Sequence, residues 1–207
     1  MQPIPPWAEL RRRGPMCLIG LTVFATGIAL TVRAHLGLAP WDVFHQGLGD
    51  RIGAKIGTVA IAAGMVILLA WIPLRQRIGL GTIANTVLVG VVLNGVLALI
   101  DEFDPIGARW CALVGGTMLI ALGTGLYIGS GLGAGPRDGV MMGLHQRGWS
   151  ITRARTGIEV SVLAAGWALG GNIGIGTVVG AFAVGPLVHL ALPRLALPPL
   201  SPALREP

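Results

Sequence analysis

The chain has 207 residues, of which 53% are hydrophobic and only 12% charged, and its mean hydropathy is +0.75. These values exclude an ordinary soluble domain of this size. The formal net charge of +6 and the sequence pI of about 11.0 fit arginines that fix membrane topology and contact anionic headgroups. The composition therefore predicts a membrane protein whose main partner is the lipid bilayer, with no nucleic-acid partner.

Apolar segments of bilayer-spanning length recur along the chain. A spanning helix needs about 20 mostly apolar residues. Six segments meet this expectation, at residues 15–32, 56–73, 79–100, 110–129, 156–172 and 175–192. They leave only an N-terminal segment at 1–14, an acidic loop at 101–109 and a Pro-rich tail at 193–207. The sequence predicts an all-α membrane protein with six transmembrane helices.

Basic residues indicate the orientation of these spans. The arginines at 11–13 precede the first span and favour a cytoplasmic N-terminus. Six spans then return the Pro-rich tail to the cytoplasm, so both termini are expected on the inner side of a bacterial plasma membrane. The exception is the segment 33–55, because Arg33, Arg51 and Lys55 would lie on the outer side.

A short motif occurs twice, about 96 residues apart, which is typical of an internal repeat. Its copies read Gly-Leu-Ala-Pro-Trp-Asp at 37–42 and Gly-Ala-Gly-Pro-Arg-Asp at 133–138. A Gly-x-Gly-Thr sequence follows each copy, at 79–82 and at 174–177. Two units are therefore expected, at 15–100 and 110–192. Three spans in each unit would insert the second unit upside down, so that the two interrupted segments meet at one central site.

Each motif also predicts a short helix that begins on its proline. Proline tolerates the first helical position because its missing N–H has no partner there. Helices at about 40–49 and 136–146, starting on Pro40 and Pro136, would be too short to span the bilayer. They are expected to be re-entrant or interfacial. Their N-termini would present free N–H groups and partial positive charge, which suit an anionic group.

The side chains beside the two prolines admit two interpretations each. Asp42 and Asp138 lie in the first helical turn, where a carboxylate can act as a helix cap. Alternatively, they contact a substrate amine, a cation or a proton at membrane depth. Trp41 is either an interfacial anchor or part of the site, and Arg137 is either a topology charge or part of the site.

Three polar residues outside the motifs are further candidates. Glu159 lies inside the predicted fifth span, where it either needs a functional partner or pairs with a nearby arginine on its own helix. Asn94 and His189 occupy matching places in the two units, where interhelical hydrogen bonding is favoured over lining a path. The other histidines, including His45, are expected to be solvated. No metal-ligand cluster, cofactor motif or activated nucleophile is visible, so we expect neither a cofactor nor an enzyme.

At these motifs the chain resembles the bacterial YitT/YczE-type integral membrane proteins. The resemblance rests on the segments at 34–42, 79–82, 132–138, 170–177 and 185–186, and it covers roughly residues 16–192. It implies a small polytopic plasma-membrane protein, often regarded as a transporter, without established substrate or catalytic residues. No soluble C-terminal domain of the YitT kind follows the last span, which favours the short YczE-like form.

Three functions remain open at this point. The first is a transporter of a small molecule or ion with a central site at the repeated segments. The second is a substrate-binding membrane subunit of a multi-component uptake system. The third is a non-transporting scaffold or regulatory partner, whose glycine-rich faces would bind further copies of the chain or another membrane protein.

Overall fold

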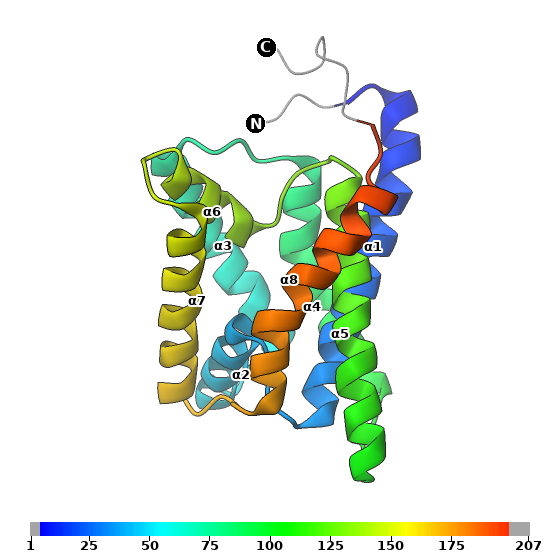
Figure 1. Cartoon of the computed structure of the whole chain (residues 1–207), viewed down its shortest axis with the longest axis vertical. Helices are drawn as coiled ribbons and strands as arrows, with labels where there is room; N and C mark the ends of the chain where they lie inside the picture. The colour runs from blue at the N-terminus through cyan, green and yellow to red at the C-terminus, as the bar shows by residue number, and fades with distance from the viewer. Residues whose placement is uncertain (1–4, 199–207) are drawn as a thin grey trace.

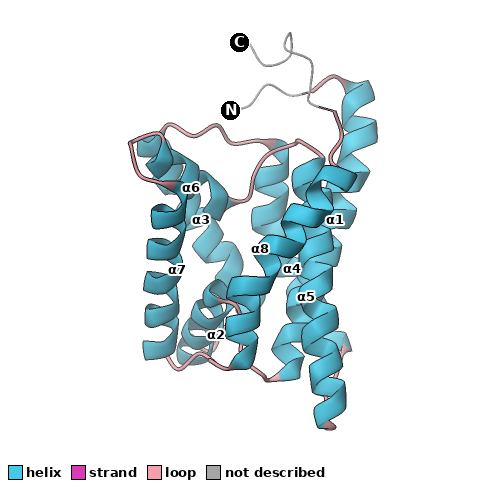
Figure 2. Ribbon diagram, in the orientation of Figure 1, coloured by secondary structure: helices cyan, strands magenta, loops and turns pink. Residues whose placement is uncertain are grey.

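The computed structural model of this chain describes residues 5–198, and the secondary structure within that range is entirely helical (Figures 1 and 2). Its helices are α1 (Trp7–Ala34), α2 (Pro40–Ile52), α3 (Ile56–Leu74), α4 (Leu80–Leu99), α5 (Ile106–Gly129), α6 (Pro136–His145), α7 (Ile151–Ala168) and α8 (Ile175–Leu195). The two short helices predicted from Pro40 and Pro136 are present as α2 and α6, and both begin on those prolines.

Five helices of the described chain are long and apolar enough to cross a membrane: α1, α3, α4, α5 and α8. The sixth predicted span, at 156–172, is not among them. The helix in that region is α7, which begins earlier, at Ile151, and carries Arg153, Arg155 and Glu159 within its 18 residues. The all-α membrane class is therefore confirmed, whereas the sixth span lacks the support of composition.

The chain ends also differ from the predicted boundaries. Helix α1 begins at Trp7, inside the segment expected to precede the first span, and α8 continues to Leu195, into the predicted Pro-rich tail. Residues 199–207 of that tail lie outside the described residues. Helix α1 begins and α8 ends at the same end of the molecule (Figure 1).

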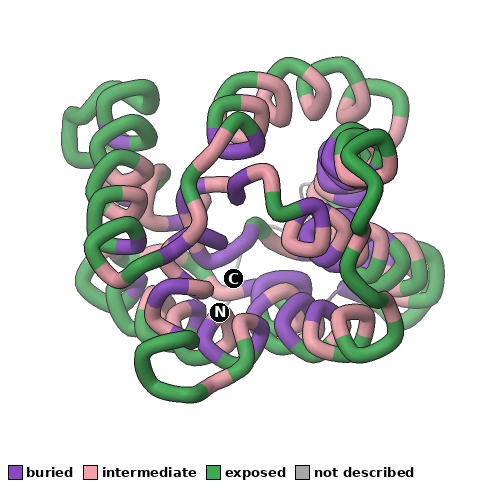
Figure 3. The backbone as a smooth tube through the Cα atoms, turned by 90° about the horizontal axis from the view of Figure 1, so that it is seen from below, coloured by how far each residue is buried: buried purple, intermediate pink, exposed green. Residues whose placement is uncertain are grey.

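Buried residues gather on the inward faces of the helices, and the outer faces are largely exposed (Figure 3). Large apolar side chains such as Leu69, Ile72 and Phe182 are among the exposed ones. A bilayer would cover such surfaces, because lipid rather than water is the solvent around spanning helices.

Helices α1 and α5 form the central pair and cross on four glycines. A Cβ on Gly20 would lie 3.0 Å from the carbonyl oxygen of Gly123, and a Cβ on Gly27 would lie 2.7 Å from that of Gly116. The earlier glycine of α1 contacts the later glycine of α5, and the later one contacts the earlier one, so the two helices run antiparallel. Small residues let the backbones approach this closely, which is how helices associate tightly in lipid.

The flanking helices share some contacts between the two halves and differ in one. In both halves the first long helix packs against the last, α1 against α4 and α5 against α8. Each short helix also packs against a helix of the other half, α2 against α7 and α6 against α3. Helix α3 also packs against α4. Helix α7 has no comparable interface with α8 and stands apart from it in Figure 1.

Two arginines close the ends of the central pair. Arg13 donates to the carbonyl oxygen of Ser130, the C-cap of α5, at 2.9 Å. Arg109 donates to the carbonyl oxygen of Ala34, the last residue of α1, at 2.7 Å. Arg109 follows Arg13, and Ser130 follows Ala34, by the separation of the two motif prolines. A cation at a helix C-terminus satisfies free carbonyls and complements the helix dipole.

The same role explains the arginines of the segment 33–55, which fit the predicted topology least well. Arg33 donates to the carbonyl oxygen of Leu97, near the end of α4. Arg51 lies 3.4 Å from the carbonyl oxygen of Leu169, the C-cap of α7. Hydrogen bonds to carbonyl oxygens at helix ends account for the positions of Arg33 and Arg51. These two charges therefore neither support nor contradict the predicted topology.

Candidate functional site

Each short helix is placed by a glycine turn that docks on the other half of the molecule. Gly37 and Gly133 have φ angles of 103° and 136°, a region that side chains with a Cβ rarely adopt. The turn at Gly37 lets Leu36 accept a hydrogen bond from the N–H of Gly176, in α8, at 2.7 Å. The turn at Gly133 lets Leu132 accept one from the N–H of Gly81, in α4, at 2.9 Å.

The beginnings of α2 and α6 meet near the middle of the molecule. The guanidinium carbon of Arg137 lies 4.7 Å from the ring centre of Trp41, a cation–π contact. Trp41 and Arg137 are the residues that directly follow the two motif prolines. The structure therefore brings together the two segments that the sequence singled out.

Two cavities lie on either side of this contact. One has a volume of about 290 Å³ and is lined by the second motif, from Gly135 to Asp138, together with α4 residues such as Asn85. The other has a volume of about 130 Å³ and is lined by the first motif, from Pro40 to Asp42, together with α8. Six residues line both cavities: Phe24, Trp41, Arg137, Arg155, Glu159 and Val184.

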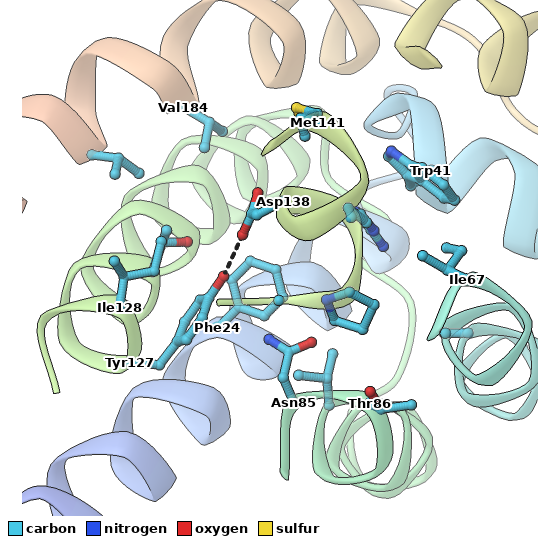
Figure 4. A pocket seen from close by; sticks show the side chains of 18 of the residues that line it. Phe24, Trp41, Ile67, Asn85, Thr86, Tyr127, Ile128, Asp138, Met141 and Val184 are labelled. Carbon is cyan, nitrogen blue, oxygen red and sulfur yellow. Dashed lines mark hydrogen bonds between the residues drawn. The ribbon is translucent and has the colours of Figure 1, made fainter. Parts of the chain in front are cut away.

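Both motif aspartates lie beside these cavities, with different partners. The hydroxyl of Tyr127 donates to Oδ2 of Asp138 at 3.3 Å (Figure 4). Asp42 is only 3% exposed, and its Oδ1 lies 3.7 Å from Nδ1 of the equally buried His45. The expectation that His45 is solvated was wrong, because its side chain faces inward from α2. The N-cap residues of α2 and α6, Ala39 and Gly135, form no side-chain cap. The carboxylate of Asp138 also lies beside the backbone of Gly135, so its cap interpretation stands next to the site interpretation.

Glu159 makes an ion pair with the arginine one turn earlier. Its Oε1 lies 3.0 Å from Nε of Arg155. This is the structural interpretation that the sequence allowed, but the pair also lines both cavities. Glu159 therefore belongs to the candidate site, and Arg155 joins it.

Asn94 and His189 are not brought to the cavities. Asn94 accepts from the N–H of Gly57 at 2.9 Å and donates to the hydroxyl of Thr58 at 3.1 Å, so it links α4 to α3. His189 is exposed on α8. Interhelical hydrogen bonding, the role that the sequence favoured, describes Asn94.

Several lining residues were not among the residues predicted from the sequence. Phe24 and Tyr127 belong to α1 and α5, outside the motifs, and their rings meet edge to face with centres 6.1 Å apart. Tyr127 is the one tyrosine of the whole sequence, which is the only signal that could have drawn attention to it. Among the described residues, no group of His, Cys, Asp and Glu could hold a metal ion.

Comparisons with known proteins agree with the membrane character of the chain. Residues 11–193 match the family of unknown function DUF6198. The chain is 33% identical to the uncharacterized membrane protein YczE of Bacillus subtilis, over 90% of this chain and 88% of that protein. It is 34% identical to an uncharacterized protein of Haemophilus influenzae, over 95% of this chain and 90% of that protein.

The Bacillus subtilis protein YyaS is also similar, at 27% identity over 84% of this chain and 90% of its own length. No solved structure gave a significant match. The family match spans almost all the helices described above, and the relatives are matched over nearly their whole lengths. The chain is therefore a membrane protein that belongs to the DUF6198 family and is related to YczE.

Proposed function

We propose that the protein is a transporter of a small molecule or ion, built from two inverted units around one central site. The observation that carries this proposal is the contact between Trp41 and Arg137, where the two copies of the motif meet between two cavities. Interrupted segments that meet at the interface of repeated units are the usual location of transporter sites.

Reciprocal contacts support the inverted arrangement. Gly116 and Gly123 are the counterparts of Gly20 and Gly27, because they follow them by the separation of the two motif prolines. Gly20 contacts Gly123, the counterpart of Gly27, and Gly27 contacts Gly116, the counterpart of Gly20. The caps formed by Arg13 and Arg109 exchange in the same way. Such an exchange is the signature of a twofold axis. With α1 and α5 antiparallel, that axis would lie in the membrane plane.

Cysteine accessibility tests this function without knowledge of the substrate. The matching positions Thr86 and Ala181 line the larger and the smaller cavity, respectively. Each would be replaced by cysteine after Cys17→Ser and Cys111→Ser, and treated with a membrane-impermeant maleimide in right-side-out and inside-out vesicles. We expect both positions to react from both sides over time, because a transporter exposes its site alternately. A cysteine at the exposed apolar position Val66 serves as the lipid-facing control.

The other functions give different results in the same experiment. Labelling from one side only would favour the substrate-binding subunit, and protection from both sides would favour the scaffold. The orientation is tested separately with reporters at residues 104 and 147, whose loops lie at opposite ends of the molecule in Figure 1. Reporters on the same side of the membrane would contradict the inverted units.

A further inference from the structure

Arg137 is a charged residue shared by both cavities. Within residues 5–198, Arg137 makes no salt bridge and no side-chain hydrogen bond, and its guanidinium lies over Trp41 and lines both cavities. A guanidinium presents five N–H donors in a planar fork that matches a carboxylate. Stacking on Trp41 holds the plane of this fork while leaving its edge free. This part of the cavity is suited to a carboxylate group.

The opposite chemistry lies beside it in the larger cavity. The carboxylate of Asp138 accepts a hydrogen bond from Tyr127 and keeps further acceptor capacity. The ring of Phe24 meets that of Tyr127 edge to face, and both line the cavity (Figure 4). A carboxylate next to aromatic rings is the usual environment for a substituted ammonium group.

The charges of the site favour a ligand that carries both signs. Arg155 and Glu159 neutralise each other, which leaves Arg137 and Asp138 as the other two charged residues that line the larger cavity. A simple anion would be repelled by the carboxylate of Asp138, and a simple cation would be repelled by the guanidinium of Arg137. A volume of about 290 Å³ accommodates a molecule of amino-acid size.

We propose, resting on the function proposed above, that the larger cavity binds a small zwitterion. Its carboxylate would pair with Arg137, and its ammonium group would lie between Asp138 and the rings of Phe24 and Tyr127. The ligand would thereby engage the N–H donors of Arg137 and the remaining acceptor capacity of Asp138.

The test is ligand-dependent thermal stability and calorimetry of the full chain in detergent micelles. The probes are two zwitterions, glycine betaine and L-alanine, with propionate as the anion and choline as the cation. We expect at least one zwitterion to raise the melting temperature and neither single-charge probe to do so at the same concentration. Binding of propionate alone, of choline alone, or of no probe up to millimolar concentrations would overturn the proposal.

Variants locate the site. Arg137→Gln and Asp138→Asn should each weaken zwitterion binding at least about tenfold, since each removes a charge-assisted contact with the ligand. Arg137→Lys keeps the charge but loses the planar fork, so it should bind between these extremes and serves if Arg137→Gln does not fold. Arg153→Gln is the matched control, because Arg153 is exposed on α7 and lines neither cavity. Unchanged zwitterion affinity in both Arg137 variants would contradict the proposal.

The two proposals fail in different ways. If the cavity cysteines react from both sides but no zwitterion binds, transport stands and the ligand class falls. If a zwitterion binds through Arg137 while the cysteines react from one side only, the ligand class stands and transport falls.

Discussion

Helices α3 and α4 lie against each other along a line of glycines, whereas α7 and α8, which follow in the same order in the second half, stand apart. A Cβ on Gly90 would overlap the carbonyl oxygen of Gly57, and Asn94 adds hydrogen bonds across the same interface. Gly185, the counterpart of Gly90, has no atom within 4 Å of the place its Cβ would occupy. The same order of repeated motifs thus gives a closely packed pair, α3 and α4, in one half and a separated pair, α7 and α8, in the other.

The residues of α3 and α7 explain the difference. Ile56 and Ile151 are the first residues of the two helices and align them. On this alignment Ala60 and Gly64 of α3 correspond to Arg155 and Glu159 of α7, and all four line the larger cavity. Small residues let α3 approach its neighbour, whereas long charged side chains keep α7 away from an apolar helix. On the same alignment Gly57, which contacts Gly90, corresponds to Thr152. The comparison indicates that side-chain size and charge along α3 and α7 favour a close pair in one half and an open one in the other.

The largest expected effect comes from filling the closed pair. Gly90→Ala should destabilise the protein by about 3 kcal/mol, because a methyl group there meets backbone that cannot move aside. Gly185→Ala is the matched control and should cost nothing, or add up to about 1 kcal/mol through helix propensity. Thermal unfolding of both variants in detergent measures the difference. Equal melting temperatures would break the comparison between the two pairs.

Cross-linking sharpens the comparison. Thr58→Cys with Asn94→Cys should form a disulfide readily in a chain without Cys17 and Cys111, because the two native side chains touch. The counterpart pair, Arg153→Cys with His189→Cys, should form little, since α7 and α8 share no such interface. Gel mobility with and without reductant reports both. Equal yields for the two pairs would show that α7 packs on α8 as α3 packs on α4.

The smallest expected effect separates the two matched polar residues. Asn94→Ala should lose about 1 kcal/mol of stability, because the N–H of Gly57 loses its partner between α3 and α4. His189→Ala should change stability by no more than about 0.5 kcal/mol, as expected for an exposed position. The melting temperatures of the two variants provide the measurement. A larger loss for His189→Ala would mean that the open pair depends on a contact absent from this structure.

Local sequence rules predicted much of the fold. Apolar length identified five helices that can cross a membrane, and the prolines of the repeated motif identified the beginnings of α2 and α6. The predicted sixth span did not gain the same support, because α7 carries charged residues that line a cavity. The rules misjudged His45, because a short helix has no burial signal of its own.

The candidate site was likewise predicted only in part from the sequence. Trp41, Asp42, Arg137 and Asp138 were visible in the sequence because they lie in a repeated, polar interruption of apolar segments. Glu159 was visible because it is a charged residue inside a predicted span. Their grouping depends on the antiparallel crossing of α1 and α5, which no local pattern encodes. Phe24, Tyr127 and Arg155 enter the site only through that crossing and the packing around it.

The sequence by itself determined the membrane class, the repeated motif and the helix starts, because hydropathy and proline geometry act over a few residues. The tertiary structure alone decided that Arg137 lies over Trp41, that Asp42 and His45 are buried and that α7 stands away from α8. These features depend on how helices distant in the chain pack together. They follow from backbones brought together by glycines and from charged side chains that cannot pack into an apolar interface.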